Sequence, residues 1–544
     1  MLYYYTSMKW QILSESKDIT KTLLDNRGIK SKKEKEDFLK PRNPLDISLE
    51  EFGINKNKLK EVVKRLKEAK KKNERIVIFG DYDCDGICAT AILWENLYSL
   101  GFDCLPYIPN RFSEGYGIKV ESINKLKEKY EEDKKSSPIK LIITVDNGIV
   151  AYDAISKAKD LGIDVIVCDH HTLGDKKLTT KFILHSTKIC GSALAYVLSS
   201  QFSKKIKGLE LAAIGTISDQ MQLIGVNRSI VKWGLEELSK TGRIGLKALI
   251  NESKLTKVGV YEIGYILAPR INAMGRLANA LDSLRLLCTK DSKKAFDLAK
   301  ILGETNVQRQ KIVDEVLNKA LKQVKVESNE IIVISGDYNE GVIGLASGKV
   351  TEKYYRPSVV FSINKEISKA SARSIYGFNI IEVIKSTKLI LEGGGHPMAA
   401  GFSIKTEKIE EFTKKLIKIS KPLLTDGILS KKLKIDMSLD FRQIDQKLID
   451  LLKKFEPTGY GNFQPVFMTK KAEIIESKSI GSDGKHLKLK IRQSKITLDA
   501  VWFNYDLSKI NQKTKLIDIA YTTEENTWNN RSLIQLKIKD INIT

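Results

Sequence analysis

The chain has 544 residues, too many for a single hydrophobic core, so we expect three or four domains. No apolar run approaches the ~20 residues that span a bilayer, and the first residues lack a signal-peptide pattern, which excludes a helical membrane protein and predicts a globular, cytoplasmic one. Ninety-one Lys and Arg against 67 Asp and Glu give a net charge of +24, which favours a polyanionic partner, although a Lys-rich composition with ordinary solvated helices would raise the charge too.

The first half of the chain alternates apolar runs with helical stretches. An irregular N-terminal arm is expected to end in a basic helix at 58–72. The predicted elements that follow are a strand at 75–79, a helix at 87–100, a strand at 140–145, a helix at 151–161 and a strand at 164–168. The strand-like runs are apolar at consecutive positions, which is typical of strands buried on both faces of a parallel sheet. Ligands of such sheets gather at the carboxyl ends of the strands.

The second half predicts three further regions. Residues 226–328 are helical and end in a long charged connector helix at 291–325, and a second, smaller α/β unit begins at 331. Beyond a Thr-Asp-Gly turn at 425–427, short alternating strands predict an antiparallel β-barrel of the oligonucleotide-binding type. We therefore expect an α/β protein whose parts are an arm at 1–72, a parallel-sheet domain at 73–225, the helical region at 226–328, the second α/β unit at 329–426 and the barrel at 427–544.

Acidic side chains follow three of the predicted strands. Asp81, Asp83 and Asp85 come after the first, Asp146 after the second, and Asp169-His170-His171 after the third, while Asp219 ends a later Gly-Thr-Ile-Ser-Asp segment. Carboxylates and imidazoles delivered together by parallel strands are what a pair of divalent metal ions needs. Carboxylate with imidazole suits Mn²⁺ or Mg²⁺, and Mn²⁺ tolerates the nitrogen better.

Each of these segments, taken alone, also fits an ordinary structural role. Asp81, Asp83 and Asp85 alternate, so in an extended chain they would share one face, but a helix cap and a solvated turn also use Asp. Asp146 before Asn-Gly is typical of a turn, and Asp219 of a loop. The six cysteines show no zinc spacing and are expected to be small buried side chains in a reducing compartment. The three carboxylates at alternate positions favour metal.

Taken together, Asp-Tyr-Asp-x-Asp-Gly, Val-Asp-Asn-Gly, Asp-His-His and Gly-Thr-Ile-Ser-Asp resemble the four motifs of the DHH phosphoesterase superfamily. Further stretches resemble the RecJ family of single-stranded-DNA exonucleases, its associated DHHA1 domain and its C-terminal barrel. These stretches are residues 109–117, 269–277, 306–310, 371–374, 393–402, 456–462 and 483–488. They cover nearly the whole chain in the family's order. The departures are a short Lys-rich segment after His171, Thr458 and Phe463, none at a presumed metal ligand.

The resemblance implies a metal-dependent exonuclease that hydrolyses single-stranded DNA from its 5′ end, in DNA repair and recombination. It implies that two Mn²⁺ or Mg²⁺ ions are held by Asp83, Asp85, Asp146, His170 and Asp219, with Asp81 and His171 close by. Of these, Asp146 is the candidate to bridge ions ~3.5–4 Å apart. The resemblance also implies a monomer that favours a 5′-phosphorylated end, and a single-strand-binding protein or helicase as partner.

The resemblance also implies a set of substrate-binding residues. They are Arg111, Tyr116, Arg270, Asn272, Arg276, Arg309, Ser371, Arg373, Gly394, Gly395, His396 and Gly401. Arginine suits phosphate because its planar fork binds two oxygens, and glycines let backbone N–H groups approach phosphate closely. Each arginine alone would be a surface cation, the glycines a plain turn, and Tyr116 or Phe112 either a base-stacking ring or part of the core.

Three alternatives remain open from the sequence. One is another DHH phosphoesterase that acts on pyrophosphate, short oligonucleotides or cyclic dinucleotides, against which the length and the barrel argue. A second is an exonuclease that acts on RNA. The third is a non-catalytic replisome component, against which the complete set of expected ligands argues.

Overall fold

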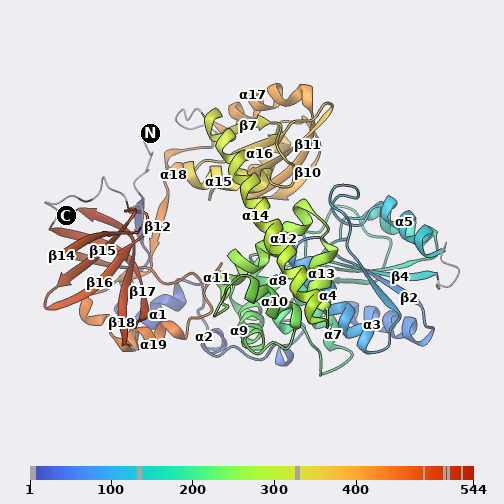
Figure 1. Ribbon diagram of the computed structural model, residues 1–544, viewed down its shortest axis with the longest axis horizontal. Helices are drawn as coiled ribbons and strands as arrows, with labels where there is room; N and C mark the ends of the chain where they lie inside the picture. Colours follow the sequence, from blue (N-terminus) through green and yellow to red (C-terminus); the bar gives the residue numbers. More distant parts are fainter. Residues whose placement is uncertain are drawn as a thin grey trace. The chain divides into compact units, whose positions relative to one another are not determined.

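A computed structural model describes residues 8–131, 138–324, 331–481, 484–505, 510, 515–528 and 531–543. By their internal contacts, residues 20–306 and 446–465 form one compact unit, and residues 1–19, 307–445 and 466–544 form the other. We call the first the catalytic unit because it contains the residues that the sequence predicts to be catalytic. The long helix α14 (Ser292–Gln323) belongs to both (Figure 1). The connector helix predicted at 291–325 corresponds to α14, as far as the structure describes this stretch. The five-part division made from sequence stays a prediction.

The catalytic unit is built on a five-stranded parallel sheet in the order β3-β2-β4-β5-β6 (Figure 1). Its strands are β2 (Arg75–Phe79), β3 (Cys104–Tyr107), β4 (Ile139–Val145), β5 (Asp164–Asp169) and β6 (Ile183–His185). Alternate residues of each strand enter two different cores: Ile78 packs toward one, and Phe79 toward the other. This is the two-sided burial that consecutive apolar residues predict.

Helices cover both faces of this sheet. One core holds α3 (Lys56–Lys71), α4 (Cys84–Ser99), α7 (Gly191–Ser200) and α8 (Leu209–Ser218), and the other holds α5 (Val120–Glu131) and α6 (Tyr152–Asp160). The N-terminal arm adds α1 (Ile19–Asp25), α2 (Lys32–Leu39) and η1 (Pro44–Asp46). The helical region adds α9 (Gly225–Ser239), α10 (Ile244–Glu252), α11 (Val260–Glu262), the π-helical turn η2 (Ile263–Leu267), α12 (Ala268–Leu277) and α13 (Leu281–Cys288).

One segment of the catalytic unit comes from far along the chain. Residues 446–465, here the inserted segment, contain α19 (Gln446–Lys453) and pack with residues 20–306, although both flanking stretches belong to the other unit. Buried Arg228 holds this segment, because its guanidinium donates hydrogen bonds to the carbonyls of Lys454, Phe455, Glu456 and Pro457 and to that of Phe38. The arginine thus holds the turn that follows α19.

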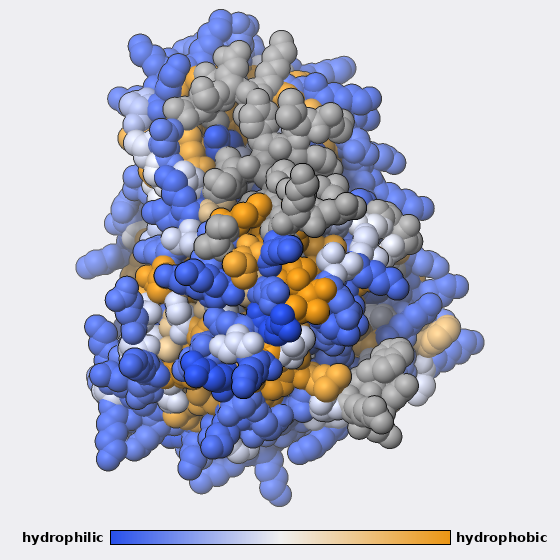
Figure 2. Space-filling view, turned by 90° about the vertical axis from the view of Figure 1, so that its left-hand side faces the viewer, coloured by the Kyte–Doolittle hydropathy of each residue, from blue (hydrophilic) through white to orange (hydrophobic). Residues whose placement is uncertain are grey.

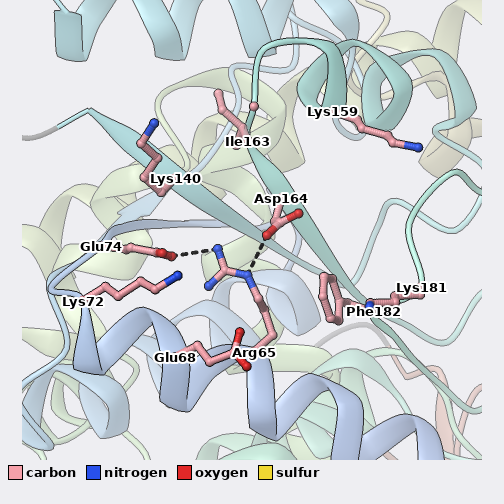
Figure 3. Close-up of a pocket in the computed structure, with 11 residues that line it drawn as sticks. Arg65, Glu68, Lys72, Glu74, Lys140, Lys159, Ile163, Asp164, Lys181 and Phe182 are labelled. Atoms are coloured by element: carbon pink, nitrogen blue, oxygen red, sulfur yellow. Dashed lines mark hydrogen bonds and ion pairs between the residues drawn. The ribbon is translucent and has the colours of Figure 1, made fainter.

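A hollow of about 460 Å³ opens at the amino-terminal edge of the parallel sheet. Arg65 lies inside it, with Nε 2.6 Å from Oδ2 of Asp164 and Nη2 2.7 Å from Oε2 of Glu74 (Figure 3). Lysines also line this hollow, and they are Lys72, Lys140, Lys159 and Lys181. The two carboxylates are paired with an arginine here, whereas the predicted metal ligands follow the opposite, carboxyl ends of the strands.

The other unit contains a mixed sheet in the order β10-β11-β9-β8-β7, in which only β7 and β8 run parallel. Its elements are β7 (Ile332–Gly336), α15 (Ile343–Tyr354), β8 (Ser358–Ser362), β9 (Ile367–Arg373), α16 (Ile380–Ser386), β10 (Ile390–His396), β11 (Ala399–Lys405), η3 (Thr406–Lys408), α17 (Ile409–Ser420) and α18 (Asp426–Leu429). Helices α16 and α17 pack on one face, and α14 and α15 on the other.

A closed barrel follows, with its strands in red in Figure 1. The order β14-β15-β16-β18-β17 is closed by pairing between β14 and β17. The strands are β14 (Phe467–Ile480), β15 (His486–Gln493), β16 (Ile496–Trp502), β17 (Leu516–Trp528) and β18 (Arg531–Ile543). The short elements beside them are β1 (Lys9–Ile12), β12 (Lys432–Ile435), β13 (Met437–Ser438) and η4 (Phe441–Gln443).

Three sequence-based details are corrected by the structure. The barrel is mixed rather than antiparallel, because the chain forms β17 before β18 returns to lie parallel to β16. The first catalytic helix begins at Cys84 and not at Ile87, because the side chain of Asp83 caps it. The N-terminal arm, expected to be irregular before its helix, contains short helices and a strand. Asp483, in the motif at 483–488, lies outside the described residues.

Hydrophilic side chains cover most of the face drawn in Figure 2, with smaller hydrophobic areas between them. Among the described residues, no helix combines the length and apolar character needed to cross a membrane. All six cysteines are free thiols, five of them buried and Cys288 half-buried. This agrees with the expectation of small buried side chains.

Candidate metal centre

The predicted acidic residues of the catalytic unit meet at the carboxyl edge of the parallel sheet. Asp146 follows β4 with a φ of 63°, a left-handed conformation that is unusual for a residue with a side chain. A β-carbon at Gly191 would lie 2.7 Å from Cβ of Asp146 and 2.8 Å from its Oδ1, so only glycine leaves room for this carboxylate. The start of α7 and the end of β4 are therefore in direct contact.

The segment after β2 does not place its three carboxylates on one face of an extended chain, as the alternation predicted. The chain turns into α4, where Asp83 is the N-cap and its Oδ1 accepts a hydrogen bond from the N–H of Gly86. Asp85 lies in the first turn and accepts from the N–H groups of Gly191 and Ser192, at 2.7 and 3.0 Å. These bonds fix Asp83 and Asp85 at the start of α4 instead of on one face of an extended strand.

Three overlapping groups of side chains could each hold a metal ion. In each group the ligand atoms lie within 4.8 Å of one another, and the groups are Asp81, Asp83 and Asp146; Asp146, His170 and His171; and Asp85, His170 and Asp219. Asp146 and His170 each belong to two of them. Nε2 of His170 lies 3.1 Å from Oδ1 of Asp146 and 3.7 Å from Oδ2 of Asp219. All seven predicted metal or catalytic residues are thus brought together.

Burial and mutual repulsion raise the pKa values of the carboxyls. Burial raises the pKa of Asp81 and of Asp146 well above the ordinary value, and the neighbouring carboxylates add to this. The same two causes raise the pKa of Asp219 to about 8. Burial lowers the pKa of His170, which favours the neutral imidazole. A site of this kind is stabilised by added positive charge.

The donor set fits hard divalent cations. Among the described residues, Oδ1 of Asp81 is buried without a hydrogen-bond partner, and Oδ1 of Asp146 faces Nε2 of His170 without the geometry of a hydrogen bond. Such buried atoms are costly unless something coordinates them. Five carboxylates and two imidazoles, without a thiolate among them, match the ligands of Mn²⁺ or Mg²⁺. The residues present are therefore suited to the two ions that the sequence predicts.

Asp169 is a candidate positioning residue that the site prediction omitted, although it belongs to the Asp-His-His segment. Its Oδ1 accepts hydrogen bonds from Nδ1 of His171 at 2.7 Å and from the N–H of His170 at 2.7 Å, and its Oδ2 accepts from the N–H of Ile149. A carboxylate behind a metal-binding histidine fixes its tautomer and orientation. The signal in the sequence is its position directly before two histidines.

Aromatic and cationic side chains lie beside the acidic segment. The guanidinium of Arg111 lies over the ring of Tyr82, 5.0 Å from its centroid, and it acts electrostatically on Asp81. Arg276 acts on the hydroxyl of Tyr82. The hydroxyl of Tyr116 is 3.3 Å from Nε2 of His171. Three of the predicted substrate-binding residues therefore lie next to the candidate metal centre.

Two other predicted substrate-binding residues of α12 make contacts within the protein. Oδ1 of Asn272 accepts a hydrogen bond from the N–H of Cys84, 2.7 Å away, at the start of α4. Nε of Arg270 donates to Oε2 of Glu252 at 2.8 Å, and its Nη1 donates to the carbonyl of Ile266. The contact of Asn272 holds the acidic segment in place, so a role in positioning is evident for this residue.

The remaining predicted residues belong to the other unit, and most of them form two rows across its sheet. In one row, Gly401 of β11 lies between Ser371 of β9 and Gly394 of β10. In the other row, Ala399 of β11 lies between Arg373 of β9 and His396 of β10. Because the rows are two residues apart, their side chains share one face. Gly395 lies between the rows on β10, at a φ of 149°, and Arg309 lies on α14.

The start of α15 lies against this face. A β-carbon at Gly344, in the first turn of the helix, would lie 2.9 Å from Oγ of Ser371 and 3.3 Å from Nη2 of Arg373. Nη1 of Arg373 donates to the carbonyl of Ala372 and to Oγ of Ser371, and burial lowers the pKa of this arginine. A guanidinium, a hydroxyl and a helix N-terminus together are suited to an anion.

Comparisons with known proteins agree with this geometry. The sequence matches family models for the DHH family, N-terminal domain, over residues 75–216, the DHHA1 domain over 323–421 and the RecJ OB domain over 435–540. It is 35% identical over 502 residues to the single-stranded-DNA-specific exonuclease RecJ of Bacillus subtilis (strain 168), and this match covers 89% of the chain and 63% of that protein. The chain therefore spans a little under two thirds of that relative.

A second relative and a solved structure are similar over a larger share of their length. The single-stranded-DNA-specific exonuclease RecJ of Thermus thermophilus is 31% identical over 498 residues, 89% of this chain and 71% of that protein. The crystal structure of RecJ from Thermus thermophilus in complex with Mn²⁺ superimposes with a TM-score of 0.83 at 26% identity, over 99% of this chain and 80% of that one. With its acidic centre, its mixed-sheet unit and its closed barrel, the chain belongs to the RecJ family of single-stranded-DNA-specific exonucleases.

Proposed function

We propose that this protein is a metal-dependent exonuclease that hydrolyses phosphodiester bonds of single-stranded DNA from the 5′ end. The observation that carries the proposal is the sharing of Asp146 and His170 among three overlapping groups of ligand atoms. Two Mn²⁺ or Mg²⁺ ions bound there would supply a water nucleophile at neutral pH and offset negative charge on the phosphate in the transition state. The relatives named above act on single-stranded DNA.

The residues of the chain have separate roles in this proposal. Asp81, Asp83, Asp85, Asp146, His170, His171 and Asp219 would hold the two ions, and Asp146, which belongs to two of the ligand groups, is the candidate to be shared between them. Arg111 and Arg276 lie beside the acidic segment and would bind phosphate oxygens of the strand. Tyr116, whose hydroxyl meets His171, would orient the terminal nucleotide.

The other unit would hold the 5′-phosphate. Support comes from Ser371 and Arg373, which lie at the N-terminus of α15, and from Gly394, Gly401 and His396, which share their face of the sheet. The exposed glycines of β10 leave backbone groups accessible to a strand. The barrel would bind DNA further from the cut by stacking and backbone charge.

An assay on end-labelled substrates tests the activity. Single-stranded DNA, single-stranded RNA and duplex DNA would be incubated with the wild-type protein and Mn²⁺, Mg²⁺ or chelator. We expect release of nucleotides from single-stranded DNA with either ion and none with chelator. The Asp146→Ala variant should retain DNA binding without turnover. Degradation in chelator, or turnover by that variant, would overturn the proposal, and faster degradation of RNA would favour the RNA alternative.

A second comparison tests the phosphate pocket. The Arg373→Ala variant should lose the preference for a 5′-phosphorylated over a 5′-hydroxyl strand, while Lys385→Ala, an exposed cation lost from α16 on the opposite face of the sheet, should keep it. Equal preference in both variants would contradict the pocket. We further propose a cytoplasmic monomer with a single-strand-binding protein or a helicase as partner, which gel filtration and pull-down against those proteins would test.

A further inference from the structure

Two pairs of solvent-exposed aromatic side chains lie on the α11–η2 helix and on the inserted segment of the catalytic unit. They are Tyr261, Tyr265, Tyr460 and Phe463, with exposed fractions of 64%, 73%, 51% and 65%. We call these four residues the aromatic surface. The rings of Tyr261 and Tyr265 stack on each other, with centroids 4.9 Å apart, and those of Tyr460 and Phe463 meet edge to face at 6.1 Å. Exposed rings gathered in one region point to a binding surface.

The two pairs of rings lie close together although they are about 200 residues apart in the chain. Tyr261 and Tyr265 lie on the helix formed by α11 and η2, whereas Tyr460 and Phe463 lie on the inserted segment. A β-carbon at Gly459 would lie 3.2 Å from Cγ1 of Val260, so the backbone beside Tyr460 packs against the residue beside Tyr261. The inserted segment therefore brings its rings to the α11 helix.

This region borders the candidate metal centre. Asp219, a predicted ligand, directly follows α8, and the N–H of Leu223, four residues later, donates a hydrogen bond of 2.7 Å to the carbonyl of Tyr460. A β-carbon at Gly264, next to Tyr265, would lie 3.8 Å from Cγ2 of Ile217 in the same helix α8. Both pairs of rings are thus joined to the segment that carries Asp219.

The surroundings of the aromatic surface are held firmly and are basic. Nη2 of Arg27 donates to the carbonyl of Phe463 and its Nε donates to Oδ1 of Asn462, at 2.6 and 2.7 Å. Exposed Lys254 and Lys257 lie in the connection that leads into α11. Rigid rings with cations beside them match a flexible polyanion that carries flat bases, and the net charge of +24 favours the same class of ligand.

We propose that the aromatic surface stacks with bases of the single-stranded DNA whose phosphodiester bonds meet the metal centre. This inference rests on the proposed function and adds to it a second set of contacts, made by rings to bases rather than by cations to phosphates. Because every base has a π-face, the contact is independent of sequence.

Binding measurements on metal-free protein separate this contact from catalysis. The variants are Tyr261→Leu/Tyr265→Leu and Tyr460→Leu/Phe463→Leu, which keep an apolar side chain and remove the ring. Tyr98→Leu is the matched control, because Tyr98 is also 64% exposed but lies about 21 Å along α4 from its metal-binding end. Affinity is measured by fluorescence anisotropy in chelator for a 5′-phosphorylated oligodeoxythymidine and for a strand of the same length made of abasic residues.

We expect each double variant to weaken binding of oligodeoxythymidine, on the order of tenfold for each stacked base lost. Binding of the abasic strand should be equal in the wild type and in all variants, and Tyr98→Leu should behave as the wild type with both strands. Equal affinity of wild type and double variants for oligodeoxythymidine would overturn the inference and point to a protein partner for the rings.

A measurement on the wild type alone guards against variants that fold poorly. The base analogue 2-aminopurine, placed at successive positions from the 5′ end, should be quenched where it meets the rings, and a uniform fluorescence along the strand would overturn the inference. Failure of the proposed function would look different. In that case the wild-type protein with Mn²⁺ would leave single-stranded DNA intact, whatever the aromatic variants do.

Discussion

Nδ1 of His171 donates a hydrogen bond to Oδ1 of Asp169, and the two atoms are 2.7 Å apart. The bond leaves Nε2 of His171 as the nitrogen that could bind a metal ion together with Asp146 and His170. Burial tends to lower the pKa of His171, but the bond to Asp169 and the nearby carboxylates raise it to about 9. The histidine must therefore lose a proton when a cation binds.

Replacement of Asp169 should loosen the metal without removing a ligand. In Asp169→Asn a neutral amide replaces the carboxylate that accepts the hydrogen bond from His171, so the imidazole is held less firmly. We therefore expect Mn²⁺ affinity, measured by calorimetric titration, to fall about 10- to 100-fold. Asp164→Asn is the control on the same strand, because Asp164 starts β5 and pairs with Arg65 at the opposite edge of the sheet. An unchanged affinity in Asp169→Asn would contradict the positioning role.

Metal binding should strengthen as pH rises. The pKa of Asp219 is raised to about 8 and that of His171 to about 9, so the folded metal-free protein holds protons that the unfolded chain releases at lower pH. Its stability should therefore fall as pH rises from about 4 to about 9. Cations compete with these protons, so the increase in Tm on adding Mn²⁺ should be larger at pH 8.5 than at pH 6. A constant increase would contradict these shifts.

A methyl group at Gly215 should disrupt the acidic centre. A β-carbon there would lie 2.2 Å from Oδ1 of Asp85 and 2.0 Å from Oγ of Ser192, so Gly215→Ala should displace Asp85 and abolish Mn²⁺ binding and nuclease activity. Gly348→Ala is the matched control, since Gly348 is also helical but has no atom within 4 Å of the added carbon among the described residues. The control should leave activity intact and stabilise α15 by up to about 1 kcal/mol.

Loss of Arg228 should release the inserted segment. Burial lowers the pKa of Arg228 to about 10, so it is still charged at neutral pH. Arg228→Met removes a donor from five backbone carbonyls, of which those of Phe455 and Pro457 keep the side-chain amide of Asn462. We expect destabilisation of about 2 kcal/mol or more and faster proteolysis within residues 446–465. Lys232→Met, an exposed cation one turn along α9, should change neither. Equal proteolysis rates in the two variants would contradict the anchoring role.

Local sequence signals predicted much of the fold because apolar runs and their ends are local properties. The predicted strand at 75–79 coincides with β2, and the one at 164–168 lies within β5. The predicted metal ligands meet because the carboxyl ends of parallel strands share one edge, while Asp219 reaches them from the end of α8. The alternating aspartates were placed on an extended chain because alternation alone does not reveal that Asp83 caps a helix.

By itself, the sequence determined the parallel sheet, the acidic centre and the family resemblance, since these depend on periodicity and on the types and order of nearby residues. Only the tertiary structure decided that Asp169 supports His171, that Ser371 shares a row with Gly401 and Gly394, and that Arg228 holds residues 446–465 in the catalytic unit. These hydrogen bonds and strand pairings join groups from different helices and strands. Their strength depends on how deeply the groups are buried and how the donors and acceptors are oriented, which a linear sequence does not specify.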